Sequence, residues 1–139
     1  MEDNAKERSL KRVEYNGERA AMYEAAIARY PLARAMDWDT MQKLLAPTKG
    51  EVILGIGEGN GFFCEPIMEA IGRTGRYVVV DPSPHQLKNL KNRVDISQLE
   101  VIAVGAHEMD FAEGTFDKIW SFGSFHHCDL QEEAMKRIY

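Results

Sequence analysis

The chain has 139 residues, 17 Lys plus Arg against 22 Asp plus Glu, and 45% hydrophobic residues, which is enough for one modest domain with a core and too little for two. Residues 1–50 carry 9 basic and 8 acidic side chains and residues 51–139 carry 8 and 14, so we expect no nucleic-acid partner, because a phosphate backbone needs clustered cations. The lack of a long apolar run, of a secretory signal and of a disulfide framework predicts a cytoplasmic protein without a membrane span.

Residues 1–47 are predicted to form an N-terminal helical segment that serves as a lid or cap. The Ala-rich stretch Glu18–Arg29 should end before Pro31, because the residue that precedes a proline avoids the helical conformation. Asp37 is expected to cap a second helix with its apolar residues on one face. A loop rich in Pro and Gly then separates this segment from a second unit, residues 48–139.

From Glu51 onward, short apolar runs alternate with helical patterns. An apolar helix stripe begins at Phe63, Ser83 is expected to cap the next helix, and Asp129 a last one. This alternation predicts an α/β fold, a doubly wound, Rossmann-like parallel sheet, whose ligands bind beyond the carboxyl ends of the strands. The predicted strands are Val52–Leu54, Tyr77–Val80, Val101–Val104 and Lys118–Ser121.

The loop after the first strand carries a glycine at every second position. Gly57, Gly59 and Gly61 allow the backbone to approach a ligand closely and to adopt a positive φ without a Cβ clash. The fingerprint of nicotinamide-dependent oxidoreductases is GxGxxG, and Phe62 stands where its third glycine would be. Such an oxidoreductase and a tight turn without a ligand remain alternatives at this point.

The spacing of these glycines after a strand resembles the first motif of the class I S-adenosylmethionine-dependent methyltransferases. The family sheet has seven strands in the order 3-2-1-4-5-7-6, so the resemblance implies a truncated sheet here, of about four strands in the order 3-2-1-4. We therefore interpret residues 48–139 as the N-terminal, cofactor-binding part of such a domain, and the chain as a fragment of a longer protein. Later segments resemble the family in the same order: Val80–Ser83, Val104–Glu108 and Gly114–Trp120, followed by Ser121–His127, which resembles the turn that faces the methionine part and the acceptor.

The resemblance implies S-adenosyl-L-methionine as the cofactor, with the ribose hydroxyls bound by Asp81. Two positions that are usually acidic are Gly55 and Gly105, so we expect weaker cofactor binding unless Glu58 supplies a substitute, and adenine contacts that are absent or shifted to His107 or Glu108. The implied cofactor-binding residues are Gly57, Glu58, Gly59, Gly61, Asp81, Pro82, Ala106, His107, Ser121 and Phe122.

The chemistry implied is a direct displacement at the sulfonium methyl, for which alignment of the nucleophile alone can supply roughly 7–11 kcal/mol. No catalytic residue is assigned, although His126 or His127 is a candidate polar lining or general base. Together with Cys128 these are three adjacent residues that cannot converge on one ion, so we expect no metal site. Tyr15, Tyr23 and Tyr30 are candidates either for closing the pocket or for plain packing.

The sequence therefore predicts a methyltransferase that acts on a small-molecule or lipid-like acceptor. The alternative is a noncatalytic S-adenosylmethionine-binding or interaction module of the same fold, which has lost the carboxylates at Gly55 and Gly105. The fourth strand would be an open edge in a four-stranded sheet, and open edges favour pairing with another chain. Self-association through this edge is the corresponding expectation.

Overall fold

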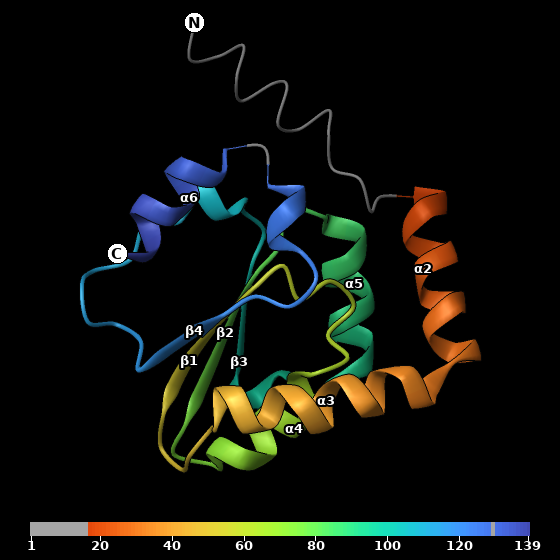
Figure 1. Ribbon diagram of the computed structural model, residues 1–139, viewed down its shortest axis with the longest axis horizontal. Helices are drawn as coiled ribbons and strands as arrows, with labels where there is room; N and C mark the ends of the chain where they lie inside the picture. The colour runs from red at the N-terminus through yellow and green to blue at the C-terminus, as the bar shows by residue number, and fades with distance from the viewer. Residues whose placement is uncertain (1–16, 129) are drawn as a thin grey trace, which may run out of the picture.

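The structure is a computed structural model that describes residues 17–128 and 130–139. These form a four-stranded parallel sheet in the order β3-β2-β1-β4, as predicted, with helices on both of its faces (Figure 1). The strands are β1 (Val52–Ile56), β2 (Arg76–Val80), β3 (Leu99–Ile102) and β4 (Lys118–Trp120). The helices are α2 (Gly17–Arg29), α3 (Pro31–Leu45), α4 (Cys64–Ile71), α5 (Pro84–Arg93) and α6 (Gln131–Ile138), with 3₁₀ turns at Ile96–Gln98, Ala106–Glu108 and Phe125–His127.

The two faces of the sheet carry two separate apolar cores. Side chains alternate along a strand, so Ile53 and Tyr77 are buried with residues of α3, α4 and α5, whereas Leu54 and Val78 are buried with Ala134 of α6. Strands covered on both faces read as continuous apolar runs, which is why β1 and β2 were recognisable in the sequence.

Helix α3 begins earlier than its sequence pattern predicts. Pro31 occupies its first turn, where a proline has no intrahelical partner to lose and its fixed φ already suits a helix. Asp37 therefore lies inside α3, and the prediction that it caps the helix was wrong. Its carboxylate instead accepts a hydrogen bond from Arg34 Nη1 at 2.8 Å. The apolar face of α3 packs on the sheet, and the ring of Trp38 stacks 6.1 Å from that of Phe63.

The boundaries of the third strand were also predicted wrongly. β3 begins at Leu99, which pairs with Tyr77 of β2, and it ends at Ile102, which pairs with Val80. Because β2 ends at Val80, the chain beyond Ile102 has no strand partner and turns away, so Val104 lies outside the sheet. The expected cap of α5 is confirmed, since Ser83 Oγ accepts a hydrogen bond from Gln86 N at 3.2 Å. The expected cap Asp129 lies outside the described residues.

Within the described ranges, no strand pairs with the outer edge of β4. A groove beside this edge is lined by Leu44 and Leu45 of α3 and by Ile119 and Trp120 of β4. Leu44 is 75% exposed. No helix among the described residues has the length and apolarity needed to cross a bilayer.

Candidate cofactor-binding site

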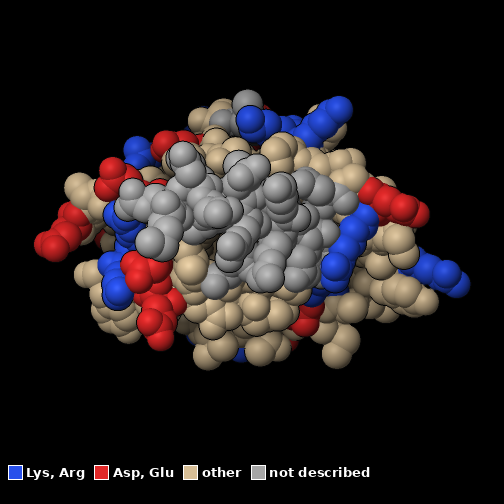
Figure 2. Space-filling model, turned by 90° about the horizontal axis from the view of Figure 1, so that it is seen from above, with Lys and Arg blue, Asp and Glu red and all other residues tan. Residues whose placement is uncertain are grey.

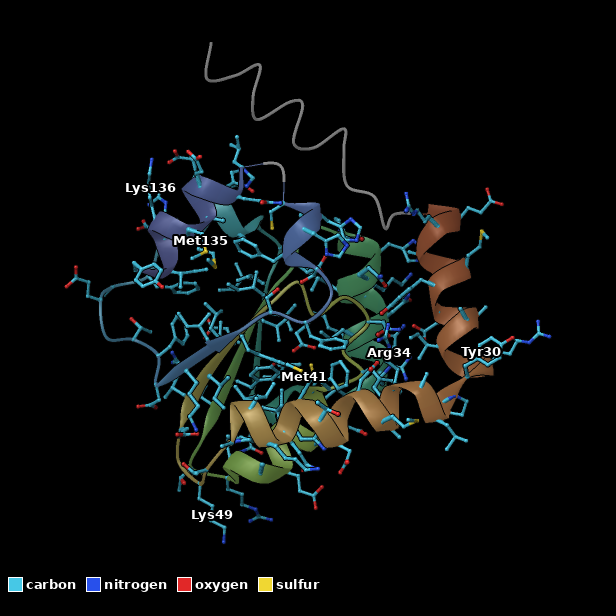
Figure 3. All side chains as sticks on the ribbon, in the orientation of Figure 1. Tyr30, Arg34, Met41, Lys49, Met135 and Lys136 are labelled. Atoms are coloured by element: carbon cyan, nitrogen blue, oxygen red, sulfur yellow. The ribbon has the colours of Figure 1, made fainter. Side chains whose placement is uncertain are left out.

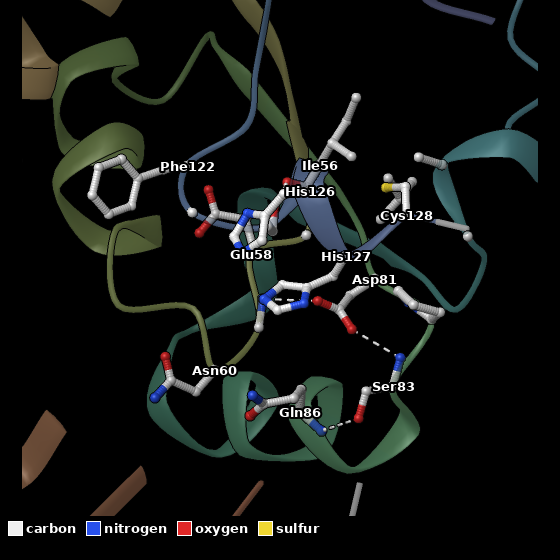
Figure 4. Close-up of a pocket in the computed structure, with 18 of the residues that line it drawn as sticks. Ile56, Glu58, Asn60, Asp81, Ser83, Gln86, Phe122, His126, His127 and Cys128 are labelled. Atoms are coloured by element: carbon white, nitrogen blue, oxygen red, sulfur yellow. Dashed lines mark hydrogen bonds between the residues drawn. The ribbon is translucent and has the colours of Figure 1, made fainter. Parts of the chain in front are cut away.

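A cavity of about 310 Å³ lies beyond the carboxyl ends of the strands, where the loops after β1, β2 and β4 meet (Figure 4). Asp81 and Ser83, which follow β2, border it together with Glu58, which follows β1, and Phe122, which follows β4. Helices α2 and α3 contribute Tyr23 and Arg34 to its wall. The predicted residues that line this cavity are Gly57, Glu58, Gly59, Asp81, Pro82, Ala106, His107 and Phe122.

Two predicted residues, Gly61 and Ser121, are not among the cavity-lining residues. Gly61 has φ +77°, and a Cβ there would come within 2.6 Å of Leu90 Cγ, so this glycine permits close packing of the loop on α5. Ser121 Oγ donates to the carbonyl oxygen of Ile56 at 3.0 Å and lies 2.8 Å from Ser124 Oγ. Both residues shape the loops around the cavity.

The glycine loop keeps its main chain close to the loop after β4. Gly57 has φ +72°, and a Cβ at this residue would lie 2.3 Å from Ser124 Oγ. Ser124 Oγ in turn donates to the Ile56 carbonyl at 2.9 Å. Gly57 therefore has two independent requirements for glycine, its backbone conformation and the approach of Ser124.

Asp81 follows β2 and is only 7% exposed. Its Oδ1 accepts from Ser83 N at 2.8 Å and its Oδ2 accepts from Gly59 N at 3.0 Å, as Figure 4 shows. Burial raises the pKa of this carboxyl, and the two backbone N–H groups oppose that rise. A carboxylate has about four acceptor sites, so this one can still accept hydrogen bonds from a ligand.

Glu58 occupies the volume that a side chain at Gly55 would fill. A Cβ built on Gly55 would lie 2.9 Å from Glu58 Cγ and Oε1, and 2.3 Å from the Tyr77 hydroxyl. The Tyr77 hydroxyl donates to Glu58 Oε1, and Trp120 Nε1 donates to the Tyr77 oxygen at 2.9 Å. The loop thus carries its carboxylate three residues later than the expected position, supported by a Trp120–Tyr77–Glu58 chain of hydrogen bonds.

The buried Glu58 carboxyl has a raised pKa. Burial, together with the nearby negative charge of Asp81, raises its pKa from 4.5 to about 7, although the hydrogen bond from Tyr77 opposes the rise. Among the described residues, Glu58 Oε2 and Gln86 Oε1 are the buried side-chain oxygens without a hydrogen-bond partner. Both residues line the cavity, so a ligand with suitably placed donors would satisfy both atoms.

Gly105, the second position without the usual acid, also leaves room for nearby side chains. A Cβ on Gly105 would lie 2.8 Å from His107 Cε1 and 3.3 Å from Glu108 Oε2. The Glu108 carboxylate accepts from Gly105 N at 2.9 Å and so turns back onto its own loop. Only His107 of this pair lines the cavity.

Several cavity-lining residues were not in the predicted set. Asn60 is buried and its Nδ2 donates to Glu24 of α2 at 2.6 Å. Gln86 lies in the helix that Ser83 caps, and Arg34 lies before the glycine loop, so neither carried a functional signal. Ser124 was indicated only indirectly, by the glycine at position 57, since any side chain there would collide with Ser124. The polar residues missed include Arg34, Asn60, Gln86 and Ser124.

His126 and His127 both line the cavity, with ring centroids 3.9 Å apart, and Cys128 lies beside them in its wall. In the described part of the chain, no group of three or more His, Cys, Asp or Glu side chains is placed to hold a metal ion. Tyr23 lies in the cavity wall, Tyr30 is 60% exposed, and Tyr15 lies outside the described residues.

Comparison with known proteins places residues 53–139 in a family described as "Methyltransferase domain". The chain is 31% identical to the tRNA U34 carboxymethyltransferase of Cellvibrio japonicus, over 65% of this chain and 29% of that protein. It is 29% identical to the ubiquinone/menaquinone biosynthesis C-methyltransferase UbiE of Klebsiella pneumoniae, over 66% of this chain and 38% of that protein. The chain spans between 27% and 42% of the length of such curated relatives.

Among solved structures, the chain is similar to an S-adenosylmethionine-dependent methyltransferase from Aquifex aeolicus. The TM-score is 0.67 at 18% identity, and the match covers 73% of this chain and 56% of that one. At this identity the similarity supports the fold.

The raised pKa of Glu58 predicts a pH-dependent stability. The folded-state pKa of about 7 exceeds the ordinary 4.5, so proton uptake stabilises the fold fully below pH 4.5, and this contribution is lost as the pH rises through 7. From pH 5 to pH 8, the free energy of unfolding of the wild type should therefore fall by about 2–3 kcal/mol relative to that of Glu58→Gln. Urea denaturation at both pH values measures this difference. An equal pH dependence in the two proteins would contradict the assignment.

Proposed function

Because the chain belongs to the class I S-adenosylmethionine-dependent methyltransferase family, we propose that it binds this cofactor in the cavity at the carboxyl ends of its strands and transfers the methyl group to a small-molecule acceptor. The observation that carries the proposal is the meeting of the glycine loop, Asp81 and Glu58 in one cavity. When bound, the cofactor supplies an electrophilic methyl group on a sulfonium.

The residues present fit this cofactor at both of its polar ends. Asp81, already fixed by Gly59 N and Ser83 N, would accept hydrogen bonds from the ribose hydroxyls. Glu58 Oε2, buried and without a partner among the described residues, would accept from the ammonium group of the methionine part. His107 and Ala106 would border the adenine. The cationic ammonium would also favour the ionised form of Glu58.

The residues of the chain act mainly by binding and orientation. Gly57 and Gly59 admit the ligand close to the main chain, and Phe122 covers the cavity on the β4 side. Alignment of an acceptor with the methyl group supplies much of the rate without side-chain chemistry. Where the acceptor must lose a proton, His126 and His127 are the candidate bases in the cavity wall.

A small acceptor is favoured by the composition of the site and of the surface. Aromatic rings gather on the β4 side of the cavity, where Phe62 and Phe122 both lie against Phe63. On the face shown in Figure 2, the Lys and Arg side chains drawn in blue are interspersed with Asp and Glu instead of forming one basic field. Of the relatives, UbiE is named for quinone biosynthesis and the Cellvibrio protein for tRNA, and we propose the small-molecule class for this chain.

A noncatalytic binding module remains the second candidate, because Gly55 and Gly105 lack the usual carboxylates. Both candidates bind S-adenosylhomocysteine, and only an enzyme converts S-adenosylmethionine to it in the presence of an acceptor. The nicotinamide alternative is not retained, since the family match is to methyltransferases.

A cytoplasmic location is proposed because Cys64 and Cys128 form no disulfide.

Calorimetric titration with S-adenosylhomocysteine tests the proposed cofactor site. The wild type should bind with a saturable heat, and Asp81→Asn should bind roughly ten- to a hundredfold more weakly, because it replaces a charged acceptor by a neutral amide. Asp39→Asn is the matched control, since Asp39 is exposed on α3 and bonds only to Gln42 and Lys43 among the described residues. No heat from the wild type at millimolar ligand would refute the proposal.

Moving the carboxylate back to residue 55 tests whether Glu58 is its substitute. Gly55 has no positive φ, so an aspartate fits its backbone once Glu58 and the Tyr77 hydroxyl are removed. Glu58→Ala in a Tyr77→Phe background should weaken S-adenosylhomocysteine binding at least about tenfold, and adding Gly55→Asp should restore most of it. Tyr77→Phe alone is the reference. Equal affinity with and without Glu58 would exclude the substitution.

We also propose that the open edge of β4 and the groove beside it support self-association. An unpaired edge next to exposed apolar side chains is a pairing surface. Sedimentation velocity should show a mass that rises with concentration, and Leu44→Lys, at an exposed position, should shift the equilibrium toward the monomer. A single monomeric species at every concentration would contradict this proposal.

A further inference from the structure

Arg34 brings a positive charge to the cavity from outside the segment that matches the family. It lies on α3, and the family match begins at residue 53. Figure 3 shows Arg34 directed from α3 toward the body of the fold, whereas Tyr30, one turn earlier, points away from it. Among the described residues that line the cavity, Arg34 is the only lysine or arginine.

The guanidinium of Arg34 is held in a defined position. Its Nη1 donates to Asp37 Oδ2 and its Nη2 to the Tyr23 hydroxyl, both at 2.8 Å. Its Cζ lies 5.8 Å from the ring centroid of Tyr23 and 5.7 Å from that of Phe122. The side chain is 22% exposed. A guanidinium fixed in this way loses little further entropy when it binds a ligand.

Helix α2 fixes the frame in which Arg34 is held. Glu24 of α2 accepts from Asn60 Nδ2 in the glycine loop at 2.6 Å, and it also pairs with Arg93 of α5. Tyr23, the neighbour of Glu24, then accepts the hydrogen bond from Arg34. The N-terminal helices are thereby attached to the rim of the cavity.

The charges of the cavity are separated in space. Asp81 follows β2 and Phe122 follows β4, and β1 lies between these two strands. Arg34, in contact with Phe122, therefore lies on the β4 side, away from the carboxylate expected to bind ribose. Arginine presents five N–H donors, and within the described chain two of them are bound by Asp37 and Tyr23.

We propose that Arg34 is the binding residue for a ligand carboxylate on the β4 side of the cavity. A planar guanidinium donates two parallel hydrogen bonds to a carboxylate, and the flanking rings of Tyr23 and Phe122 limit the approach of water. The carboxylate has two sources, the methionine part of the cofactor or the acceptor. The first source rests on the proposed function, and the second can be measured on the protein alone.

The first arm compares S-adenosylhomocysteine with 5′-methylthioadenosine, which shares the nucleoside but lacks the amino-acid carboxylate. If the cofactor is the source, Arg34→Met should weaken binding of S-adenosylhomocysteine roughly ten- to a hundredfold and leave 5′-methylthioadenosine within about twofold. Arg34→Lys keeps the charge but not the planar guanidinium, so its affinity for S-adenosylhomocysteine should lie between that of the wild type and that of Arg34→Met. Arg29→Met is the matched control, because Arg29 is exposed and lies 5.6 Å over the ring of Tyr30.

The second arm titrates benzoate and its neutral analogue benzamide into the protein, with and without S-adenosylhomocysteine. If the acceptor is the source, benzoate should bind saturably to the wild type and to Arg29→Met, Arg34→Met should lose this binding, and benzamide should not bind. Thermal melting followed by circular dichroism shows whether each variant is folded. If Arg34→Met does not fold, Arg34→Lys, which can keep the ion pair with Asp37, takes its place in both titrations.

The outcomes separate the two proposals. A wild type that binds no S-adenosylhomocysteine but binds benzoate through Arg34 refutes the cofactor site and retains the carboxylate site. Unchanged binding of both S-adenosylhomocysteine and benzoate by Arg34→Met overturns the role of Arg34. An equal loss for 5′-methylthioadenosine and S-adenosylhomocysteine also overturns it, because a purely structural role would weaken both nucleosides alike.

Discussion

The volume beneath the glycine loop holds one carboxyl side chain, and its occupation by Glu58 constrains the residues around it. Gly55 must lack a side chain, since a Cβ there would meet both Glu58 and the Tyr77 hydroxyl. Tyr77 and Trp120, from the two strands that flank β1, provide the hydrogen bonds that hold the carboxyl in this place. Burial then raises the pKa of Glu58 to about 7, so the loop carries a titratable group near neutrality.

Gly105, the other glycine at a usually acidic position, has a different outcome. It leaves room for the His107 ring and the Glu108 carboxylate, but Glu108 accepts a hydrogen bond from Gly105 N and only His107 lines the cavity. Absence of an acid at one sequence position, as at Gly55, is thus a poor guide to the charge of a site, because a loop can deliver the same group from a position a few residues away. Gly55, which looked like a loss in the sequence, is the residue that makes its replacement by Glu58 sterically possible.

Periodicity was sufficient to predict the parallel sheet, and the family resemblance implied its strand order and most of the predicted residues that line the cavity. Buried parallel strands read as apolar runs, and Asp81 follows β2 where the spacing predicts it. The errors have local causes: Pro31 starts α3 before Asp37, and β3 ends where β2 stops offering partners. Arg34 and Gln86 could not be found, because their approach to the cavity depends on how α3 and α5 pack, and no spacing along the chain encodes that packing.

Ser121 and Ser124 both donate to the carbonyl of Ile56 and lie 2.8 Å apart, so the loop after β4 is fastened to the start of the glycine loop. Neither loop can shift without disturbing the other, and a larger residue at Gly57 would push the serines aside. Sequence variation that reshapes the cavity is therefore more restricted in these two loops than in α2 and α3, which border the cavity without bonding to the Ile56 carbonyl.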